Sequence, residues 1–237
     1  MHEEVLQAQG LDVFYGTSQV LFKMSLSVRK GETLALLGRN GAGKSTTMKA
    51  IAGVIASRRG SVELEGRAIR GQPSHRIARA GIGFVPEDRQ IFTELSVEDN
   101  LKIATKRGAN GEQDWSVDRV YDMLPLLKPL RERLGGQLSG GEQQMLTIGR
   151  ALMTNPDVLI LDEATEGLAP LIAREIWRIC SVIKDSGISA IIVDKNWKHV
   201  TQITDRNVIL VKGEVVFEGT SEALHADPTV LEQHLGV

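Results

Sequence analysis

The sequence predicts an α/β fold: a mixed or parallel sheet at the core, an N-terminal antiparallel β-subdomain and an inserted α-helical subdomain. Apolar runs such as residues 32–38 (ETLALLG) and 157–162 (DVLILD) recur between helical segments, which favours buried parallel strands. Residues 20–28 instead alternate apolar and mostly polar side chains, as a half-buried strand does. A chain of 237 residues is long enough to bury one substantial core. We therefore expect one domain, 1–237, with 1–87 and 157–237 forming the core and β-subdomain, and about 88–156 the helical subdomain.

The elements before the helical subdomain alternate between strands and helices. Residues 11–16 predict a strand that pairs with 20–28, and 32–38 predict a buried strand. Pro73 and Gly81 are typical of the first and last positions of a helix. The remaining elements expected in this part are a helix at 45–54, a short strand at 61–66 and a strand at 82–87.

In the second half, helices come first and the strands then return. Ser96 with Asp99 three residues later forms a capping-box pattern at the start of a helix. Further helices are expected at 116–128 and 139–153, strands at 157–162, 189–194 and 207–211, a strand pair turning at Lys212 and Gly213, and mostly helix over 221–237. Between the strands at 157–162 and 189–194, one helical face carries Ile172, Ile176, Ile179 and Ile183.

Composition favours a soluble, cytoplasmic protein. With 28 basic and 30 acidic residues the formal net charge is −2, which indicates neither a nucleic-acid surface nor a polybasic membrane tether. The N-terminal residues lack an export signal, and the apolar runs are far shorter than the roughly 20 residues that cross a bilayer. The single cysteine, Cys180, cannot form an intrachain disulfide and is expected to be a buried thiol. If the protein works at a membrane, other subunits must hold it there.

Residues 38–46 (GRNGAGKST) have the spacing of a phosphate-binding loop between a buried strand and a helix. Glycines let the backbone N–H groups point at phosphate oxygens, and the helix N-terminus favours an anion. Lys44 would contact the β- and γ-phosphates, and Ser45 would offer a hydroxyl to Mg²⁺. The alternative is a chance glycine-rich turn. The predicted nucleotide-binding residues are Gly38, Arg39, Asn40, Gly41, Ala42, Gly43, Lys44, Ser45 and Thr46.

Two carboxylates, Asp162 and Glu163, end the strand 157–162. Beside a phosphate loop, the first can hold Mg²⁺ through its waters and the second can orient or deprotonate an attacking water. The alternative is a pair of solvated acids at the edge of a loop.

A second helix start also has the features of an anion site. Ser139 caps a helix whose first turn carries Gly140 and Gly141, so free N–H groups and a hydroxyl come together. The alternative is an ordinary capped helix. Two phosphate-binding helix ends in one chain suggest that two copies clamp a nucleotide between them.

The stretch LSGGEQQ (138–144), followed by the Asp162-Glu163 strand, resembles the signature of ATP-binding cassette ATPases over essentially the whole chain. The resemblance implies a P-loop NTPase core that binds ATP and Mg²⁺ and hydrolyses ATP, with Glu163 and Lys44 catalytic. It also implies a head-to-tail pair of cassettes, in which the phosphate loop of one faces Ser139, Gly140 and Gly141 of the other. Tyr15 would stack on adenine, unless it is a core aromatic.

Three longer segments, VPEDRQIFTELSVEDNL, LSGGEQQMLTIGRALM and LDEATEGLAP, resemble an ATP-binding subunit of bacterial branched-chain amino acid importers. Importers of urea and short amides look similar. This resemblance implies a second cassette, identical or a sister, two membrane permease subunits and, indirectly, a periplasmic binding protein. The cassette would sit at the cytoplasmic face of the inner membrane and never touch the cargo, so its sequence does not name the substrate.

Three positions depart from the general family pattern. Glu87 replaces the usual glutamine and can still ligate Mg²⁺, and Ala169 replaces a frequent aspartate. Lys195 stands where a histidine usually touches the γ-phosphate, and as a protonated, mobile charge it would act as an electrostatic clamp. The alternative is an idle, solvent-directed lysine. His199 is expected at the surface.

Three functions fit these patterns. The first is a working ATPase subunit of an importer, and the retained Glu163 favours it. The second is a nucleotide-binding regulatory cassette whose own site is degenerate and whose sister cassette hydrolyses ATP, for which Glu87 and Lys195 leave room. The third, a soluble cassette in repair or translation, is disfavoured because such proteins usually carry two cassettes or long coiled-coil insertions.

Overall fold

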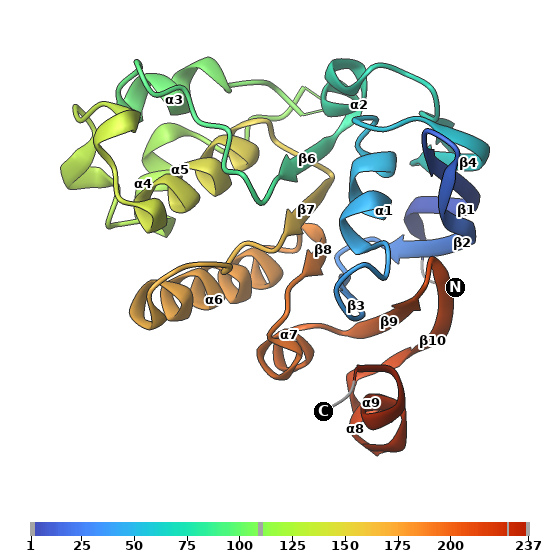
Figure 1. The fold of residues 1–237 in the computed structure, drawn as a ribbon. Coiled ribbons are helices and arrows are strands. Elements are labelled where there is room, and N and C mark those ends of the chain that lie inside the picture. The colour runs from blue at the N-terminus through green and yellow to red at the C-terminus, as the bar shows by residue number, and fades with distance from the viewer. Residues whose placement is uncertain (1–2, 109–110, 227, 236–237) are drawn as a thin grey trace.

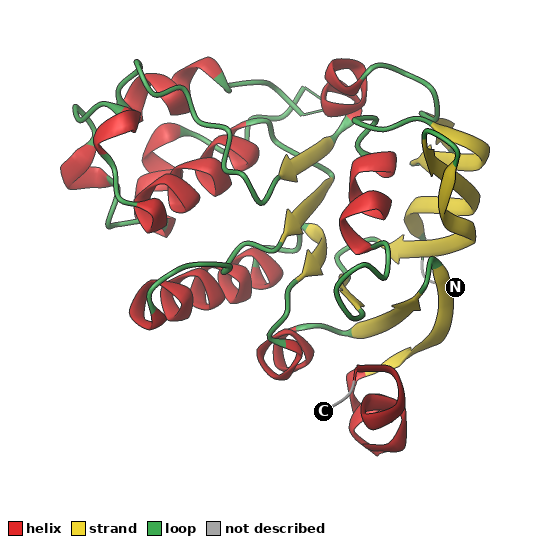
Figure 2. Cartoon of the chain, in the orientation of Figure 1, coloured by secondary structure: helices red, strands yellow, loops and turns green. Residues whose placement is uncertain are grey.

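The computed structural model describes residues 3–108, 111–226 and 228–235. Two β-sheets and their covering helices form the body, and a group of helices, α3 to α5, lies to one side, opposite β1, β2 and β4 (Figure 1). Figure 2 shows the same division, with the yellow strands on one side and a purely helical group on the other. The α/β class predicted from the sequence is confirmed.

The central sheet has six strands in the order β10-β9-β3-β8-β7-β6. From β9 to β6 all neighbours run parallel, and β10 pairs antiparallel with β9 at the edge. Because β8 lies between β3 and β7, the loops after these three strands meet at one edge of the sheet. The strands are β3 (Thr33–Leu37), β6 (Ile82–Val85), β7 (Val158–Asp162), β8 (Ser189–Val193), β9 (Arg206–Val211) and β10 (Glu214–Thr220).

Both faces of this sheet are covered. Successive residues of β3 belong to different hydrophobic clusters, Leu34 and Leu36 to one and Ala35 and Leu37 to the other, as the two-residue side-chain period requires. The strands are therefore buried on both sides and form continuous apolar runs. The helices of this body are α1 (Lys44–Ile51), α2 (Ser74–Ala80), α6 (Pro170–Asp185), α7 (Trp197–Ile203), α8 (Ser221–Ala226) and α9 (Pro228–Leu235).

The second sheet is antiparallel and has four strands in the order β2-β1-β4-β5. The predicted N-terminal pairing is confirmed, but β1 begins seven residues before the expected strand at Leu11. The pairing shifts register between Ala8 and Leu11, where Gly10 has φ +60°, so one simple alternation does not run through β1. The strands are β1 (Glu4–Tyr15), β2 (Ser18–Arg29), β4 (Ser57–Leu64) and β5 (Arg67–Ala68).

The helical group contains α3 (Val97–Ile103), α4 (Val117–Met123) and α5 (Gly140–Met153), with the 3-10 turns η1 (Lys128–Leu130) and η2 (Gly135–Gln137). The helix expected to reach Lys128 ends at Met123, because Leu124 precedes Pro125 and leaves the helical region. The predicted C-terminal helix is two helices, and residues 227 and 236–237 of that prediction lie outside the described residues.

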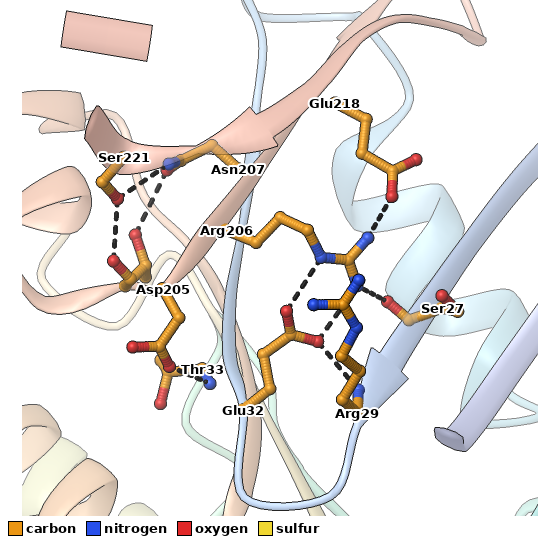
Figure 3. A network of polar contacts seen from close by, with 10 residues as sticks. Ser27, Arg29, Glu32, Thr33, Asp205, Arg206, Asn207, Glu218 and Ser221 are labelled. Atoms are coloured by element: carbon orange, nitrogen blue, oxygen red, sulfur yellow. Dashed lines mark hydrogen bonds and ion pairs between the residues drawn. The ribbon is translucent and has the colours of Figure 1, made fainter. Parts of the chain in front are cut away.

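A buried arginine joins the two sheets (Figure 3). Arg206 Nε donates to Glu32 Oε1 at 2.8 Å, and Nη2 donates to Glu32 Oε2 at 3.0 Å and to the Ser27 carbonyl at 2.6 Å. Its Nη1 also contacts Glu218 on β10. The guanidinium of Arg206, on β9, thus connects three segments: the end of β2, the turn before β3, and the edge strand β10.

Cys180 is buried, as the sequence predicts, and burial raises the pKa of its thiol to about 12. Along the described parts of the chain, no helix combines the length and the apolar character that crossing a membrane requires.

Candidate functional site

The phosphate loop connects β3 to α1 and lies directly against β9. Gly38 and Gly43 have φ values of +151° and +108°. A Cβ atom on Gly38 would lie 2.4 Å from the Leu210 carbonyl oxygen, and one on Gly43 would lie 2.7 Å from Leu21 Cδ2. The loop can approach these neighbours only without side chains at the two positions.

Lys44 begins α1 and is 4% exposed. Its Nζ donates to the carbonyls of Gly38 (2.9 Å) and Arg39 (3.3 Å), and lies 4.0 Å from Glu163 Oε1. Burial lowers the pKa of Lys44, while the carboxylates of Glu163 and Asp162 oppose that effect. The ammonium is fixed at the centre of the loop.

Ser45 and Asp162 form an oxygen-rich pair beside the loop. Ser45 Oγ donates to Asp162 Oδ1 at 3.0 Å. Asp162 is fully buried, and its Oδ2 has no hydrogen-bond partner among the described residues. Burial raises the pKa of this carboxyl. A buried carboxylate oxygen without a partner, next to a hydroxyl, fits a hard cation such as Mg²⁺.

Glu163 follows β7 with φ +49°, a conformation that non-glycine residues seldom adopt. Its N–H donates to the Val193 carbonyl at 2.8 Å, and its side chain is 10% exposed. Burial, together with a hydrogen bond to the Glu166 carboxyl, raises the pKa of Glu163 to about 7, against the charges of Lys195 and Lys44. A carboxylate with a pKa near 7 has the proton affinity of a general base at neutral pH.

Lys195 faces these carboxylates. Its Nζ lies 3.4 Å from Glu163 Oε2 and forms an ion pair with Glu166 Oε1. The side chain is 46% exposed. His199, one turn further along, is exposed and stacks on Trp177 with ring centroids 5.8 Å apart.

A cavity of about 270 Å³ joins the phosphate loop to the acidic groups. The carboxylates of Glu87, Glu163 and Glu166 approach within 4.8 Å of one another. The cavity therefore brings together most of the predicted loop and carboxylate positions. Its lining residues are Asn40, Gly41, Gly43, Lys44, Ser45, Thr46, Glu87, Glu163, Glu166 and Lys195.

The predicted second phosphate site lies elsewhere, on α5. Ser139 and Glu142 form a capping box, with Ser139 N donating to Glu142 Oε2 at 2.7 Å. Gly141 packs so closely that its Cβ would lie 2.4 Å from Ile172 Cγ2. Ser139, Gly140 and Gly141 do not line the cavity at Lys44, and neither does Tyr15, which is 50% exposed at the end of β1.

Two residues of the site were not anticipated. Glu166 enters the cavity because the turn after β7 brings it back toward Glu163 three positions earlier. Asp194 is buried and accepts hydrogen bonds from Thr165 Oγ1 at 2.5 Å and from Asn196 N at 2.9 Å. Position alone could have indicated Asp194, because it follows a parallel strand directly, as Asp162 and Glu163 end another.

The chain is similar to proteins of known function over nearly its whole length. It is 38% identical to the high-affinity branched-chain amino acid transport ATP-binding protein BraG of Pseudomonas aeruginosa over 232 residues, covering 98% of this chain and 100% of that protein. It is 34% identical to the lipopolysaccharide export system ATP-binding protein LptB of Escherichia coli strain K12, covering 98% and 97%. These two relatives serve different transport systems.

The fold is similar to that of solved cassettes. The ADP conformation of MJ1267, an ATP-binding cassette of an ABC transporter, superposes with a TM-score of 0.79 at 28% identity, covering 99% of each chain. The sequence profile of the ABC transporter family matches residues 21–166, more than half of the chain. The chain therefore belongs to the ABC transporter family and is one of its ATP-hydrolysing cassettes.

Proposed function

We propose that this cassette is the ATP-binding and ATP-hydrolysing subunit of a membrane importer for branched-chain amino acids. The observation that carries the proposal is the juxtaposition of Lys44 and Glu163. A buried ammonium at the phosphate loop and a carboxylate with a raised pKa lie 4.0 Å apart across one cavity. Such a pair can hold a terminal phosphate and accept a proton beside it.

The phosphate loop binds the triphosphate. Gly41, Gly43, Ser45 and Thr46 line the cavity around the N-terminus of α1, an end that favours an anion, and Lys44 adds a positive charge. Mg²⁺, which offsets phosphate charge when bound, would be held by Ser45, Asp162 and Glu87. Asp162 Oδ2 has no hydrogen-bond partner among the described residues, and a bound cation would give this oxygen a partner.

Glu163 acts as the general base. As the oxygen of a water molecule forms its bond to the γ-phosphorus, one proton of that water passes to Glu163 and the bond to the ADP oxygen breaks. The developing charge lies close to Lys44 and Lys195. Their ammonium groups stabilise that charge through fixed electrostatics in a partly buried site.

Hydrolysis would require a second cassette. Ser139, Gly140 and Gly141 form a helix start that takes no part in the cavity of its own chain. In a head-to-tail pair, with a second copy or with a sister cassette, this helix start would face the γ-phosphate bound by the partner. Tyr15, exposed at the end of β1, would stack on the adenine.

The membrane subunits would dock on a groove between the core and the helical group. A cavity of about 350 Å³ lies between α2, β6 and α5, and Val54 at its edge is 55% exposed. Among its lining residues in the described part of the chain, His75, Arg89 and Arg150 can carry positive charge and none is acidic. In a complex with two cassettes and two permease subunits, one permease binding this groove on each cassette would hold the cassettes at the cytoplasmic face of the inner membrane.

The likeness to BraG supports branched-chain amino acids as cargo. A periplasmic binding protein would deliver that cargo to the membrane subunits. A urea or short-amide importer is the alternative, because the cassette never touches its cargo. A second function, a regulatory cassette with a degenerate site, is favoured by one observation: Lys195 pairs with Glu163, the base itself.

The test is MgATP hydrolysis by the purified chain. We expect slow turnover by the wild type, and Glu163→Gln to abolish it while ATP binding persists. Glu112→Gln, a matched change at an exposed position outside the site, should leave the rate unchanged. Equal turnover in wild type and Glu163→Gln would exclude hydrolysis at this site.

A further inference from the structure

We propose that Glu166 is a positioning residue that competes with the γ-phosphate of ATP for the ammonium of Lys195. The inference rests on the proposed function of the site and adds a residue to it. Glu166 would weaken the binding of a nucleoside triphosphate without weakening that of a diphosphate.

The competition begins with the contacts of Lys195. Its Nζ forms an ion pair with Glu166 Oε1 and lies 3.4 Å from Glu163 Oε2. The carboxylate oxygens of Glu166 and Glu163 approach within 4.8 Å of each other. All three side chains line the cavity together with Gly41, Gly43 and Lys44 of the phosphate loop. The ammonium of Lys195 therefore lies where it can form an ion pair with either the Glu166 carboxylate or the terminal phosphate of a bound nucleotide.

The loops that carry the pair are fixed to each other. Asp194, beside Lys195, accepts hydrogen bonds from Thr165 Oγ1 at 2.5 Å and Thr165 N at 3.3 Å. Thr165 in turn precedes Glu166. The Glu163 N–H donates to the Val193 carbonyl at 2.8 Å. Because these backbone positions are tied, the Lys195–Glu166 pair is a consequence of the fold at this edge of the sheet.

The strength of the pair sets the size of the effect. Lys195 is 46% exposed and Glu166 is 37% exposed. Exposed ion pairs contribute little free energy. The Lys195–Glu166 pair must break when the γ-phosphate of ATP binds the Lys195 ammonium, so ATP binding is weakened by the small free energy of that pair. We therefore expect removal of Glu166 to tighten triphosphate binding by about two- to five-fold. ADP has no γ-phosphate and should bind almost unchanged.

The experiment is isothermal titration of the full chain with Mg²⁺ and either ADP or the nonhydrolysable ATP analogue that has an imido bridge between the β- and γ-phosphates. The variants are Glu166→Gln, Lys195→Ala and the double substitution. Glu98→Gln is the matched control, because it removes the acid of a Lys–Glu pair outside the site, Glu98–Lys102.

Glu166→Gln should tighten the analogue about two- to five-fold, with ADP changed less than two-fold. In the Lys195→Ala background the same substitution should have a smaller effect, since no ammonium is left to release. Glu98→Gln should change neither ligand. An unchanged affinity for the analogue, an equal change for ADP, or an equal effect in both backgrounds would overturn the proposal. If the wild type bound neither nucleotide, the proposed function itself would fail.

Discussion

The Nζ atom of Lys195 lies 3.4 Å from Oε2 of Glu163, so the loop after β8 places a positive charge beside the carboxylate that follows β7. The sheet order explains the contact. Because β8 lies between β3 and β7, a residue after β8 is placed between the phosphate loop and Glu163. Lys195 therefore lies in the same cavity as Lys44 and could contact the γ-phosphate that Lys44 would bind.

We expect Lys195→Ala to raise KM for ATP or lower kcat, because a positive charge is lost beside the developing phosphate charge. Lys195→His should largely restore activity, since a histidine at this position can also donate to phosphate. Steady-state ATPase assays at several ATP concentrations test both variants. Wild-type kinetics in Lys195→Ala would mean that the lysine is idle.

The turnover rate should rise with pH from about 6 to 8. Burial and the neighbouring Glu166 raise the pKa of Glu163 to about 7, and only the deprotonated form, which predominates above that pKa, can accept a proton. Lys195 lowers this pKa, so Lys195→Ala should move the profile to higher pH. The measurement is kcat against pH for both proteins. A flat wild-type profile, or a shift to lower pH in the variant, would contradict this assignment.

Arg206→Met should destabilise the fold by about 3–5 kcal/mol, because Glu32 would remain buried without its partner. Burial alone would raise the pKa of Glu32, but hydrogen bonds from Arg206 and the Arg29 N–H outweigh it and hold the pKa below its ordinary value. The stabilisation is therefore present above the ordinary pKa of the unfolded chain and is lost as pH falls through the lower folded-state value.

Urea unfolding at pH 7 and under acidic conditions measures both effects. Arg174→Met, at an exposed position on α6, is the matched control and should change stability little. If Arg206→Met were as stable as that control at pH 7, the arginine would not join the two sheets energetically.

Gly141→Ala should destabilise the protein by about 1–3 kcal/mol, because the new Cβ would lie 2.4 Å from Ile172 Cγ2. Ile172→Ala removes that atom, so the double substitution should be more stable than the sum of the single effects predicts. Gly136→Ala meets its nearest neighbour, Thr93, at 3.4 Å and serves as control. Thermal unfolding of the four variants tests the contact, and strictly additive effects would argue against it.

Much of the fold could be predicted because its signals are local. Continuous apolar runs marked the parallel strands, and Ser96 and Ser139 marked helix starts that the structure confirms. The alternation pattern does not predict the early part of β1, because a register shift near Gly10 interrupts it. The predicted helix at 116–128 is too long, because Leu124, which precedes Pro125, leaves the helical region.

The site was harder to predict beyond the residues whose spacing is regular. The loop around Lys44 and the acids at Asp162 and Glu163 are adjacent in sequence to the strands that place them. The Lys195–Glu166 pair joins residues 29 positions apart, and the contact depends on strand order and on the Thr165–Asp194 hydrogen bonds. No local pattern contains that information.

The most direct test of the account is the molecular mass of the Glu163→Gln variant in solution with MgATP. Blocked hydrolysis should trap ATP between the phosphate loop of one cassette and the α5 helix start of another. We predict a stable pair with MgATP, either of two copies or with a sister cassette, and separate chains with MgADP. A variant that binds MgATP but stays monomeric, even with its sister cassette present, would contradict the account.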